Sequence, residues 1–285
     1  MFIVVRLTAR IKFRQVLFPG QHSMISLITR LGDSFLYAVR DQGRMGLFLL
    51  ATLKGIFARP FRFREVVRQI RIIGANSFAV IFFTAIFTGM VLGLQGYYTL
   101  RKFGSEGLLG SAVALSLIRE LGPVLTALMV TGRAGSAMCA EIGIMRNSEQ
   151  LDALECMAVD PFRYLITPKF LATMISIPAL TQIFNVVGIG GGYLAGVILL
   201  GVNPGAFYNG IEQSVVNQDI NLGIVKSFVF ALLVVWICTG RGYFVHVLRS
   251  AGFGAEGVSR ATTQAVVLSS ISVLIWDYLI TAVML

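Results

Sequence analysis

The chain has 285 residues, of which 56% are hydrophobic and 13% are charged, and its mean hydropathy is +0.78. Soluble domains carry about 25% charged residues, so this composition excludes an ordinary soluble domain and indicates one polytopic membrane domain. The net charge is +10, and residues 1–72 hold 13 of the 24 Lys and Arg but only 3 of the 14 acids. This favours a basic segment on an anionic membrane surface over nucleic-acid binding.

Residue types that carry catalysis or bind metals are sparse. The three cysteines, Cys139, Cys156 and Cys238, have neither metal-binding nor redox spacing, and the two histidines are too few and too far apart for a metal site. A phosphate-binding glycine loop would need its lysine and a preceding strand, and neither is present in the sequence. We therefore expect no metal, no other cofactor and no catalytic residue in this chain.

The N-terminal part of the chain is basic and only partly apolar. Residues 1–23 form a weakly patterned extension, and Met24 is an alternative start. Residues 24–72 form a basic interfacial segment: apolar residues recur every three or four positions over 24–58, but charges interrupt them. This pattern predicts an interfacial helix, or a pair of them, instead of a membrane span.

Residues 73–285 contain five apolar stretches that are long enough to cross a bilayer as helices. The second is longer than a bilayer needs, so we expect it to bend at Pro123 or to project from the membrane. A polar link at about 202–221 separates the third span from the fourth. The five spans are expected at about 74–98, 107–143, 168–201, 222–245 and 262–284. The predicted fold is an all-α integral membrane protein.

Small residues recur at four-residue spacing in two of these spans. Gly89 and Gly93 form one such pair, and Gly188, Gly192 and Gly196 form a double one. In lipid, such residues let helix backbones approach closely. We expect them to mark tight contacts between helices.

The distribution of Lys and Arg gives an orientation. With the N-terminus in the cytoplasm, the cytoplasmic loops hold most of the basic residues, and the C-terminus lies on the other side. The opposite loops hold Arg101 and Lys102, with Lys226 just inside a span. The loop between the second and third spans then lies in the cytoplasm.

That loop contains the short acidic stretch 148–158, "SEQLDALECMA". We expect a helix capped by Asn147, with Gln150 at its third position, and ended by Asp160-Pro161. Leu151, Leu154 and Met157 would form one apolar stripe, with the acids on other faces. An anionic membrane surface would repel such a helix, so it suits a groove on a soluble partner instead. A permease with a docking helix and no nucleotide motif of its own suggests an ATP-binding-cassette transporter.

Two stretches carry a specific resemblance. The long one is "ALSLIRELGPVLTALMVTGRAGSAMCAEIGIMRNSEQLDALECMAVDPFRYLITPKFLA", and "SRATTQAVVLSS" lies near the end. They closely resemble the MlaE/YrbE permease family of bacterial phospholipid transporters, over about residues 60–285. Residues 1–23 depart from the family.

The resemblance implies a homodimeric permease in the bacterial inner membrane that moves phospholipids to or from a periplasmic Mce-domain ring and so maintains outer-membrane lipid asymmetry. Two cytoplasmic ATPase subunits, which bind the ATP and Mg²⁺, would dock on the acidic helix, with a small STAS-like regulatory subunit as a further partner. Two alternatives are an ABC permease for a sterol or a toxin and an ion-coupled secondary transporter. The residues expected to couple the permease to the ATPase are Glu149, Gln150, Leu151, Asp152, Leu154, Glu155 and Met157.

Three charges, Arg119, Glu120 and Asp277, lie well inside predicted spans, where charge is costly. Arg119 could bind a lipid phosphate, Glu120 or Asp277 could relay protons, or Arg119 could form a buried structural pair with one of these carboxylates. The family resemblance favours the first, because those permeases hold a lipid at the dimer centre near the positions that match Arg119 and Glu120. The same correspondence adds Leu92, Thr99, Leu100 and Phe103 to the lipid site.

Two further charges, Arg133 and Glu141, lie near the cytoplasmic end of the second span. They either order the docking loop or extend toward the membrane surface as single boundary charges.

Overall fold

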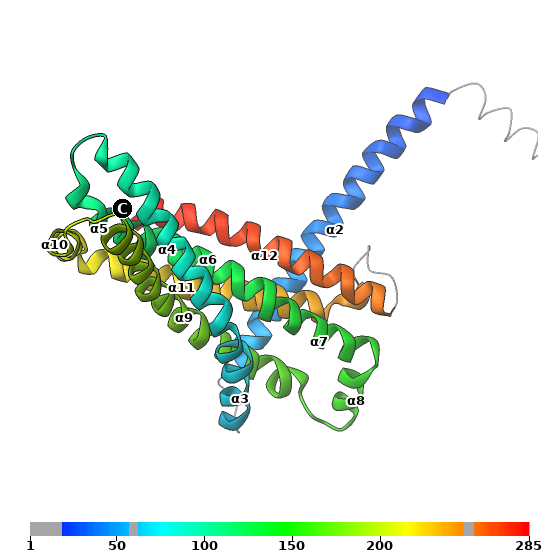
Figure 1. Cartoon of the computed structure of the whole chain (residues 1–285). Coiled ribbons are helices and arrows are strands. Elements are labelled where there is room, and N and C mark those ends of the chain that lie inside the picture. Colours follow the sequence, from blue (N-terminus) through cyan, green and yellow to red (C-terminus); the bar gives the residue numbers. More distant parts are fainter. Residues whose placement is uncertain (1–18, 57–61, 248–253, 285) are drawn as a thin grey trace, which may run out of the picture. The chain divides into compact units, whose positions relative to one another are not determined.

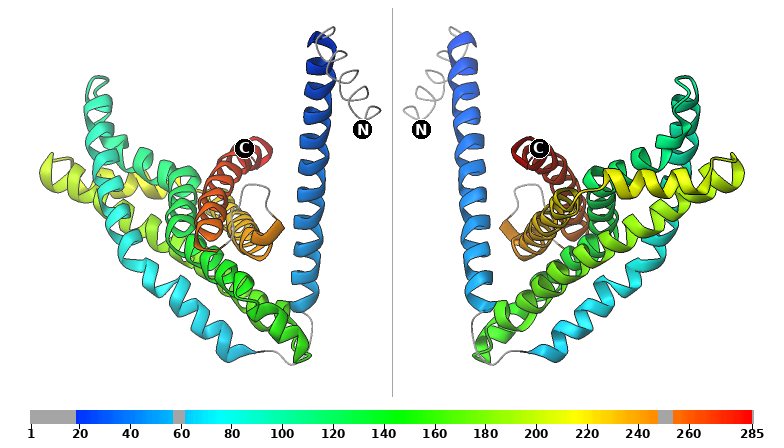
Figure 2. Two further views of the ribbon diagram at one scale, coloured as in Figure 1. Left: turned by 90° about the vertical axis from the view of Figure 1, so that its right-hand side faces the viewer. Right: turned by 90° about the vertical axis from the view of Figure 1, so that its left-hand side faces the viewer.

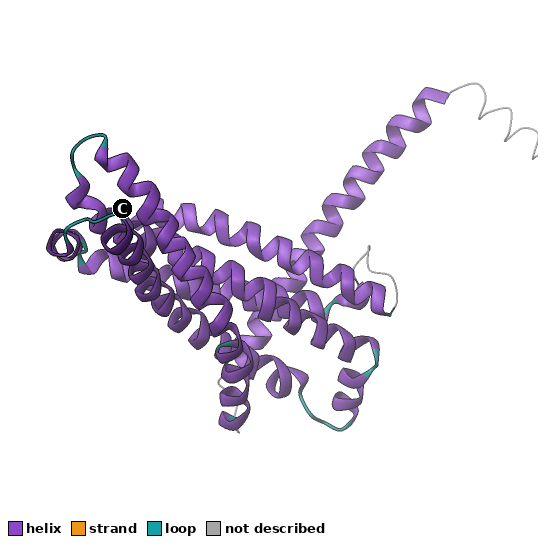
Figure 3. Ribbon diagram, viewed as in Figure 1, coloured by secondary structure: helices purple, strands orange, loops and turns teal. Residues whose placement is uncertain are grey.

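The computed structural model describes residues 19–56, 62–247 and 254–284. Every regular element within these ranges is a helix (Figure 3), which confirms the predicted all-α class. Most of the extension 1–23 lies outside the described residues. The chain divides into two compact units, one ending at Phe48 and the other beginning at Leu49.

The basic N-terminal segment forms two helices. The first, α2 (Pro19–Ile56), has 38 residues, and the second, α3 (Phe63–Ile73), has 11. Helix α3 carries the arginines Arg64, Arg68 and Arg71 on its exposed surface. It belongs to the second unit, which contains the rest of the fold.

Among the described residues, five helical stretches are long and apolar enough to cross a membrane, which confirms the predicted number of spans. They are Phe63–Arg101, Glu106–Asn147, Phe162–Leu199, Asn217–Tyr243 and Ala255–Met284. The first stretch contains α3, η1 (Ala75–Ser77) and α4 (Phe78–Arg101). The second contains η2 (Glu106–Leu108), α5 (Leu109–Ser116), η3 (Leu117–Leu121), α6 (Gly122–Val130), η4 (Thr131–Gly135) and α7 (Ser136–Asn147). The third contains η5 (Phe162–Ile166), α9 (Thr167–Tyr193) and η6 (Leu194–Leu199); the last two are α11 (Asn217–Tyr243) and α12 (Ala255–Met284).

Four of these short segments, η3 to η6, are π-helical turns inside longer helices. A π turn is rare and often occurs at a functional site. Two of them, η3 and η4, interrupt the second span, and Pro123 follows the first at the start of α6. A π turn that was not predicted therefore lies shortly before Pro123.

A short helix, α10 (Pro204–Ser214), lies in the segment that we expected to be a polar link. The side chain of Asn203 accepts hydrogen bonds from the N–H groups of Gly205 and Ala206 at 2.8 and 3.3 Å. Proline at the first helical position suits this start, because its missing N–H would have no partner there. The segment does connect the third and fourth spans, but the helix within it was not predicted, although Asn-Pro is a helix-start signal.

Close backbone contact joins the first and third spans. Helix α4 runs alongside α9 in Figures 1 and 2. A Cβ atom added to Gly89 would collide with the carbonyl group of Gly188, and one added to Gly93 would lie 2.9 Å from the carbonyl oxygen of Gly192. Both glycine motifs therefore mark a tight helix contact, as predicted.

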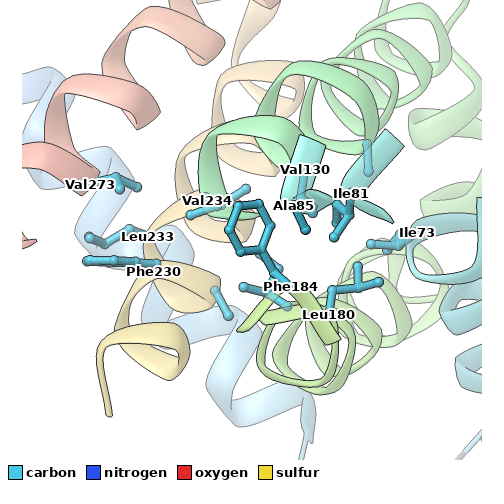
Figure 4. Close-up of a cluster of buried hydrophobic side chains, with 14 of the residues drawn as sticks. Ile73, Ile81, Ala85, Val130, Leu180, Phe184, Phe230, Leu233, Val234 and Val273 are labelled. Carbon is cyan, nitrogen blue, oxygen red and sulfur yellow. The ribbon is translucent and has the colours of Figure 1, made fainter. Parts of the chain in front are cut away.

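The buried core joins residues from all five spans. In Figure 4, Ile81 and Ala85 of α4 and Phe184 of α9 lie near Val130 of α6. Helices α11 and α12 also contribute, and the labelled members from them are Phe230, Leu233, Val234 and Val273. This core packs the five spans against one another.

The connections between spans gather at two opposite ends of the second unit. The short helix α8 (Gln150–Cys156) lies next to the end of α7, and Asn147 at that end donates a hydrogen bond to the carbonyl of Gly254 before α12. At the other end, Gln218 at the start of α11 donates to the carbonyl of Met284. The start of the fifth span therefore lies beside α8, and its end lies beside the start of the fourth.

Candidate functional site

A buried ammonium group lies at the centre of the second, fourth and fifth spans. Lys226 of α11 is fully buried, with a side-chain exposure of 0%. Its Nζ lies 2.6 Å from Oε2 of Glu120 in η3 and 2.7 Å from Oδ1 of Asp277 in α12. Thr281 donates a further hydrogen bond to the other oxygen of Glu120, at 3.0 Å. Glu120 and Asp277 thus share one cation contributed by a third helix.

The same ammonium group also satisfies the backbone of the second span. Pro123 has no N–H, so it cannot bond to the carbonyl of Arg119 four residues earlier. The Nζ of Lys226 donates to that carbonyl oxygen at 2.9 Å. Lys226 therefore provides the positive charge for two carboxylates, and it also replaces the hydrogen bond that the proline removes.

Arg119 has a different partner. Its Nε donates to Oδ1 of Asp219 in the first turn of α11 at 2.8 Å, and the Asp219 side chain is 5% exposed. The other oxygen of Asp219 accepts from the backbone N–H of Val216, which holds the carboxylate in place. The expectation of a structural pair between Arg119 and Glu120 or Asp277 was wrong, because Lys226 occupies both of those carboxylates.

The outer end of Arg119 is accessible. Its side chain is 32% exposed, and within the described part of the chain its hydrogen bond to Asp219 uses Nε and leaves the two terminal NH₂ groups without a partner. These groups keep the forked geometry that suits a phosphate or carboxylate. Asp219 thus orients the guanidinium, and the free end can bind an anion.

The other residues of the predicted lipid site lie on α4 and just after it. Leu92 and Leu100 are half-buried against the core, and Thr99 donates to the carbonyl of Gln95 within its own helix. Phe103 is 77% exposed. Arg119 and Glu120 lie on η3 instead, so the predicted set is divided between two elements of this chain.

The acidic helix α8 is anchored by its apolar side to its own chain. Leu151 is fully buried in a cluster with Ile142 and Leu165, and Leu154 is half-buried against that cluster. The expected partner-facing stripe is therefore wrong for Leu151, because α7 and η5 already cover it. The exposed members of the predicted coupling set are Glu149, Gln150, Asp152, Glu155 and Met157.

One arginine connects α8 to two spans. Arg146 near the end of α7 pairs with Asp152 at 2.7 Å, and its guanidinium lies 5.4 Å from the centroid of the Tyr243 ring at the end of α11. It also donates to Nδ1 of His246 at 3.3 Å. A cation above an aromatic face adds about 0.5–1 kcal/mol at an exposed site. Asp152 is thus held by a contact that also reaches the fourth span.

Both ends of α8 have left-handed backbone conformations at residues other than glycine. Glu149 before the helix has φ 58°, and Ala158 after it has φ 57°. At the second end, Ala158 N–H donates to the carbonyl of Glu155 and Val159 N–H to that of Leu154, which form a Schellman turn. The prediction that Asn147 caps the helix and Asp160-Pro161 ends it was wrong, because Asn147 belongs to α7 and Asp160 instead accepts from the N–H of Phe162.

Arg133 and Glu141 join helices at the end of the second unit that carries α8. Arg133 donates from Nη1 to the carbonyl of Ile72 and to the hydroxyl of Ser77, at 2.9 and 3.0 Å. Glu141 pairs with Lys169 of α9 at 2.6 Å. The structure favours fixed contacts for both residues over simple boundary charges.

Comparison with known proteins identifies the family. The profile of the permease MlaE family matches residues 66–283. The chain belongs to the MlaE permease family. The intermembrane phospholipid transport system permease protein MlaE of Haemophilus influenzae is 44% identical over 262 residues, which are 92% of this chain and 98% of that protein. A probable ABC transporter permease protein of Rickettsia bellii is 40% identical over 90% of this chain and 97% of its own length. The chloroplastic protein TRIGALACTOSYLDIACYLGLYCEROL 1 of Arabidopsis thaliana is 32% identical over 83% of this chain and 65% of its own length.

Membership of the MlaE family has direct consequences for the chain. It is a multi-pass membrane protein and a permease subunit of an ABC transporter, so its partner is an ATPase and the chain is not itself an enzyme. No cofactor is known for such permease subunits. Within the described ranges, no group of histidine, cysteine or carboxylate side chains could hold a metal ion.

Two residues of the charge network in this MlaE-family chain were missed in the sequence. Lys226 was treated as a charge at the edge of a span, and Asp219 was placed in a polar link. The signal for Lys226 was its position in "GIVKSFVF", an apolar run in which an ionisable residue marks a functional or paired position. No local pattern connects Asp219 to Arg119, because the two lie 100 residues apart.

The contacts of Lys226 with Glu120 and Asp277 predict the effect of replacing the lysine. Lys226→Met removes the cation from the partly buried carboxylates of Glu120 and Asp277, so we expect the permease to lose stability, by less than the roughly 3–5 kcal/mol of a fully buried pair. The triple variant with Glu120→Gln and Asp277→Asn should recover most of that loss. Thermal unfolding of the purified permease in detergent measures both effects, with Lys102→Met in an exposed turn as the control. An unchanged unfolding temperature for Lys226→Met would contradict the assignment.

Proposed function

We propose that this chain is the membrane subunit of an ABC transporter that moves phospholipids between the bacterial inner membrane and a periplasmic Mce-domain partner. This transport would maintain the lipid asymmetry of the outer membrane. The name of the 44% identical relative from Haemophilus influenzae supports phospholipid as the substrate class. The observation that carries the proposal is the partly exposed guanidinium of Arg119 inside the span domain. Asp219 sets its orientation, and its terminal NH₂ groups have no partner among the residues that the structure describes.

The chemistry of Arg119 favours a phospholipid over the alternative substrates. A phosphate diester is a permanent anion with oxygen atoms that accept two parallel N–H bonds from a guanidinium. A sterol or an uncharged toxin offers no such group. Leu92, Thr99, Leu100 and Phe103 of the α4 segment would then line the path of the lipid, and Glu120 supports Arg119 by holding Lys226 against the Arg119 carbonyl.

The assembly follows the same reasoning. We propose a homodimer with two cytoplasmic ATPase subunits, which bind ATP and Mg²⁺, a small STAS-like regulatory subunit and a periplasmic ring. The exposed acidic face of α8, with Glu149, Asp152 and Glu155, suits a basic groove on the ATPase. Leu151 and Leu154 anchor α8 to α7. A displacement of α8 by the ATPase would therefore be transmitted to the second span through this packed contact.

The proposed orientation places α8 and the N-terminus in the cytoplasm and α10 and the C-terminus in the periplasm. The end of the second unit that carries α8 holds many of the basic residues, including Arg146 and Arg163, whereas the turn at the other end holds Arg101 and Lys102. This asymmetry is the usual signature of the cytoplasmic side.

Cysteine labelling checks the orientation. In a background without Cys139, Cys156 and Cys238, a cysteine at Gln213 should react with an impermeant maleimide added to intact spheroplasts, and one at Glu155 should not. Both positions are exposed, so permeabilisation should make both reactive. The opposite labelling pattern would overturn the orientation.

Charge reversal on α8 tests the ATPase interface. Glu155→Arg should reduce the ATPase that co-purifies with the permease at least tenfold, because it places a cation against a basic groove. Glu155 is preferable to Asp152, since changing Asp152 would also release Arg146. The matched control is Glu212→Arg, the same change at an exposed position of α10 at the other end of the spans. Full ATPase recovery with Glu155→Arg would show that this face is not the docking surface.

Lipid binding tests the role of Arg119 itself. Arg119→Ala alone would leave the buried Asp219 carboxylate unpaired, so the informative variant is Arg119→Ala with Asp219→Asn. We expect this double variant to fold but to lose phospholipid affinity about tenfold or more, the loss expected for charge-assisted hydrogen bonds. Asp219→Asn alone keeps the guanidinium and should retain the lipid. Thermal stability and co-purified phospholipid are measured on the same samples, and a stable double variant with its full lipid content would refute the assignment.

A further inference from the structure

A small cavity with charged residues in its lining lies at the α8 end of the spans, away from the Arg119 cluster. It has a volume of about 90 Å³ and lies where the end of α3 meets the second and third spans. The cavity is lined by Gln69, Ile72, Ile73, Arg133, Ala134, Ala137, Met138, Glu141 and Lys169. Ligand pockets for drug-sized molecules measure about 300–1,000 Å³, so this one could admit only a small group.

The lining of the cavity carries an excess of positive charge. Arg133 and Lys169 contribute two cations and Glu141 one carboxylate, so the net charge is +1. Lys169 is almost fully buried, with 1% of its side chain exposed, and is neutralised by Glu141 at 2.6 Å. Arg133 is half-buried and pairs with no carboxylate in residues 19–56, 62–247 and 254–284. A half-buried permanent charge without a counter-ion is costly, and a bound anion would remove that cost.

Arg133 also has hydrogen-bond donors to spare. A guanidinium has five N–H groups, and the two hydrogen bonds of Arg133, to Ile72 and Ser77, both use Nη1. These bonds hold the guanidinium of Arg133 in one orientation, because one of the acceptors, the carbonyl of Ile72, belongs to the last turn of α3. The Nε and Nη2 groups form the edge that would bind two oxygens of a phosphate.

The surroundings of the cavity indicate where the anion comes from. Ile72 and Ala137 at its edge are exposed, whereas Ile73, Ala134 and Met138 behind them are buried. Helix α3 beside it exposes both arginines and the apolar residues Phe63 and Val67, a combination that attracts anionic lipids and accepts their apolar parts. We propose that this cavity binds the phosphate of an anionic phospholipid from the adjoining membrane surface, with Arg133 as its main ligand. The bound lipid would connect α3 to the second and third spans, and it is separate from the lipid that we propose at Arg119.

Site-specific photo-cross-linking tests this proposal. The complete transporter is reconstituted in phosphatidylcholine vesicles that contain a phosphatidylglycerol with a photoreactive group next to its phosphate. After irradiation, mass spectrometry should find cross-links in segments 69–73 and 133–141. Arg133→Gln should reduce them at least tenfold. Arg71→Gln, at an exposed arginine of α3 outside the lining, should not. Equal losses in the two variants would mean general attraction to a basic surface and would overturn the proposal.

Two further arms keep the test decisive. Ala137→Leu fills the mouth of the cavity without touching the hydrogen bonds of Arg133, so it should also abolish these cross-links even if Arg133→Gln fails to fold. Inorganic phosphate at 100-fold excess over the probe should leave the cross-links unchanged. Displacement by phosphate would assign the site to the free anion and not to a lipid, and persistent cross-links in Ala137→Leu would place the lipid elsewhere. Because the peptides are mapped, these outcomes do not depend on whether the Arg119 site transports lipid.

Discussion

An ammonium ion inside a membrane domain must be surrounded by its own counter-charges, and Lys226 imposes that requirement on three spans at once. Its nitrogen contacts carboxylates from η3 and α12 and a backbone carbonyl from the second span. Each contact has a length fixed by hydrogen bonding, so the second, fourth and fifth spans have one mutual register along their axes. Apolar packing alone would define this register far less sharply, because one leucine can take the place of another at similar depth. The rest of the domain is built around this fixed point.

The first and third spans are joined by different physics. Glycines remove the side chains between α4 and α9, so the helices meet backbone to backbone at Gly89 and Gly188. The fold thus combines a polar contact that sets register with a close apolar contact that sets distance. Neither uses the outer end of Arg119 or the acidic face of α8. These two surfaces are therefore free for binding while the framework that positions them is rigid.

Some of this architecture could be predicted from the sequence, and the reason is that it depends on local patterns. The five spans follow from stretches of apolar residues, and the glycine contact follows from four-residue spacing. The partner of Arg119 could not be predicted, because counting residues gives depth along a helix but not the direction in which a side chain points. Arg119 was the expected partner of Glu120 or Asp277, but the cation that contacts both carboxylates is Lys226, from a third helix.

The acidic helix illustrates a related limit. Its apolar stripe is visible in the sequence, but the sequence does not say what covers the stripe. In the structure α7 and η5 cover Leu151, so the surface left for a partner is the acidic one. The local signals at Asn147 and Asp160 were assigned to the wrong helix: Asn147 is the last residue of α7 and donates to the carbonyl of Gly254, and Asp160 accepts from the N–H of Phe162 at the start of the third span.

The π turns of the second span affect how related chains should be aligned. A π turn holds one residue more than an α turn, which corresponds to a rotation of about 100° in a regular helix. A helical wheel that treats this span as a single α-helix would therefore give the wrong angle between the directions of Arg119 and Arg133 around the helix axis. A chain that has lost one residue at η3 would keep its hydropathy profile but present a different set of side chains to α11. Alignments of such spans need gaps inside helices, at positions where gaps are normally penalised most.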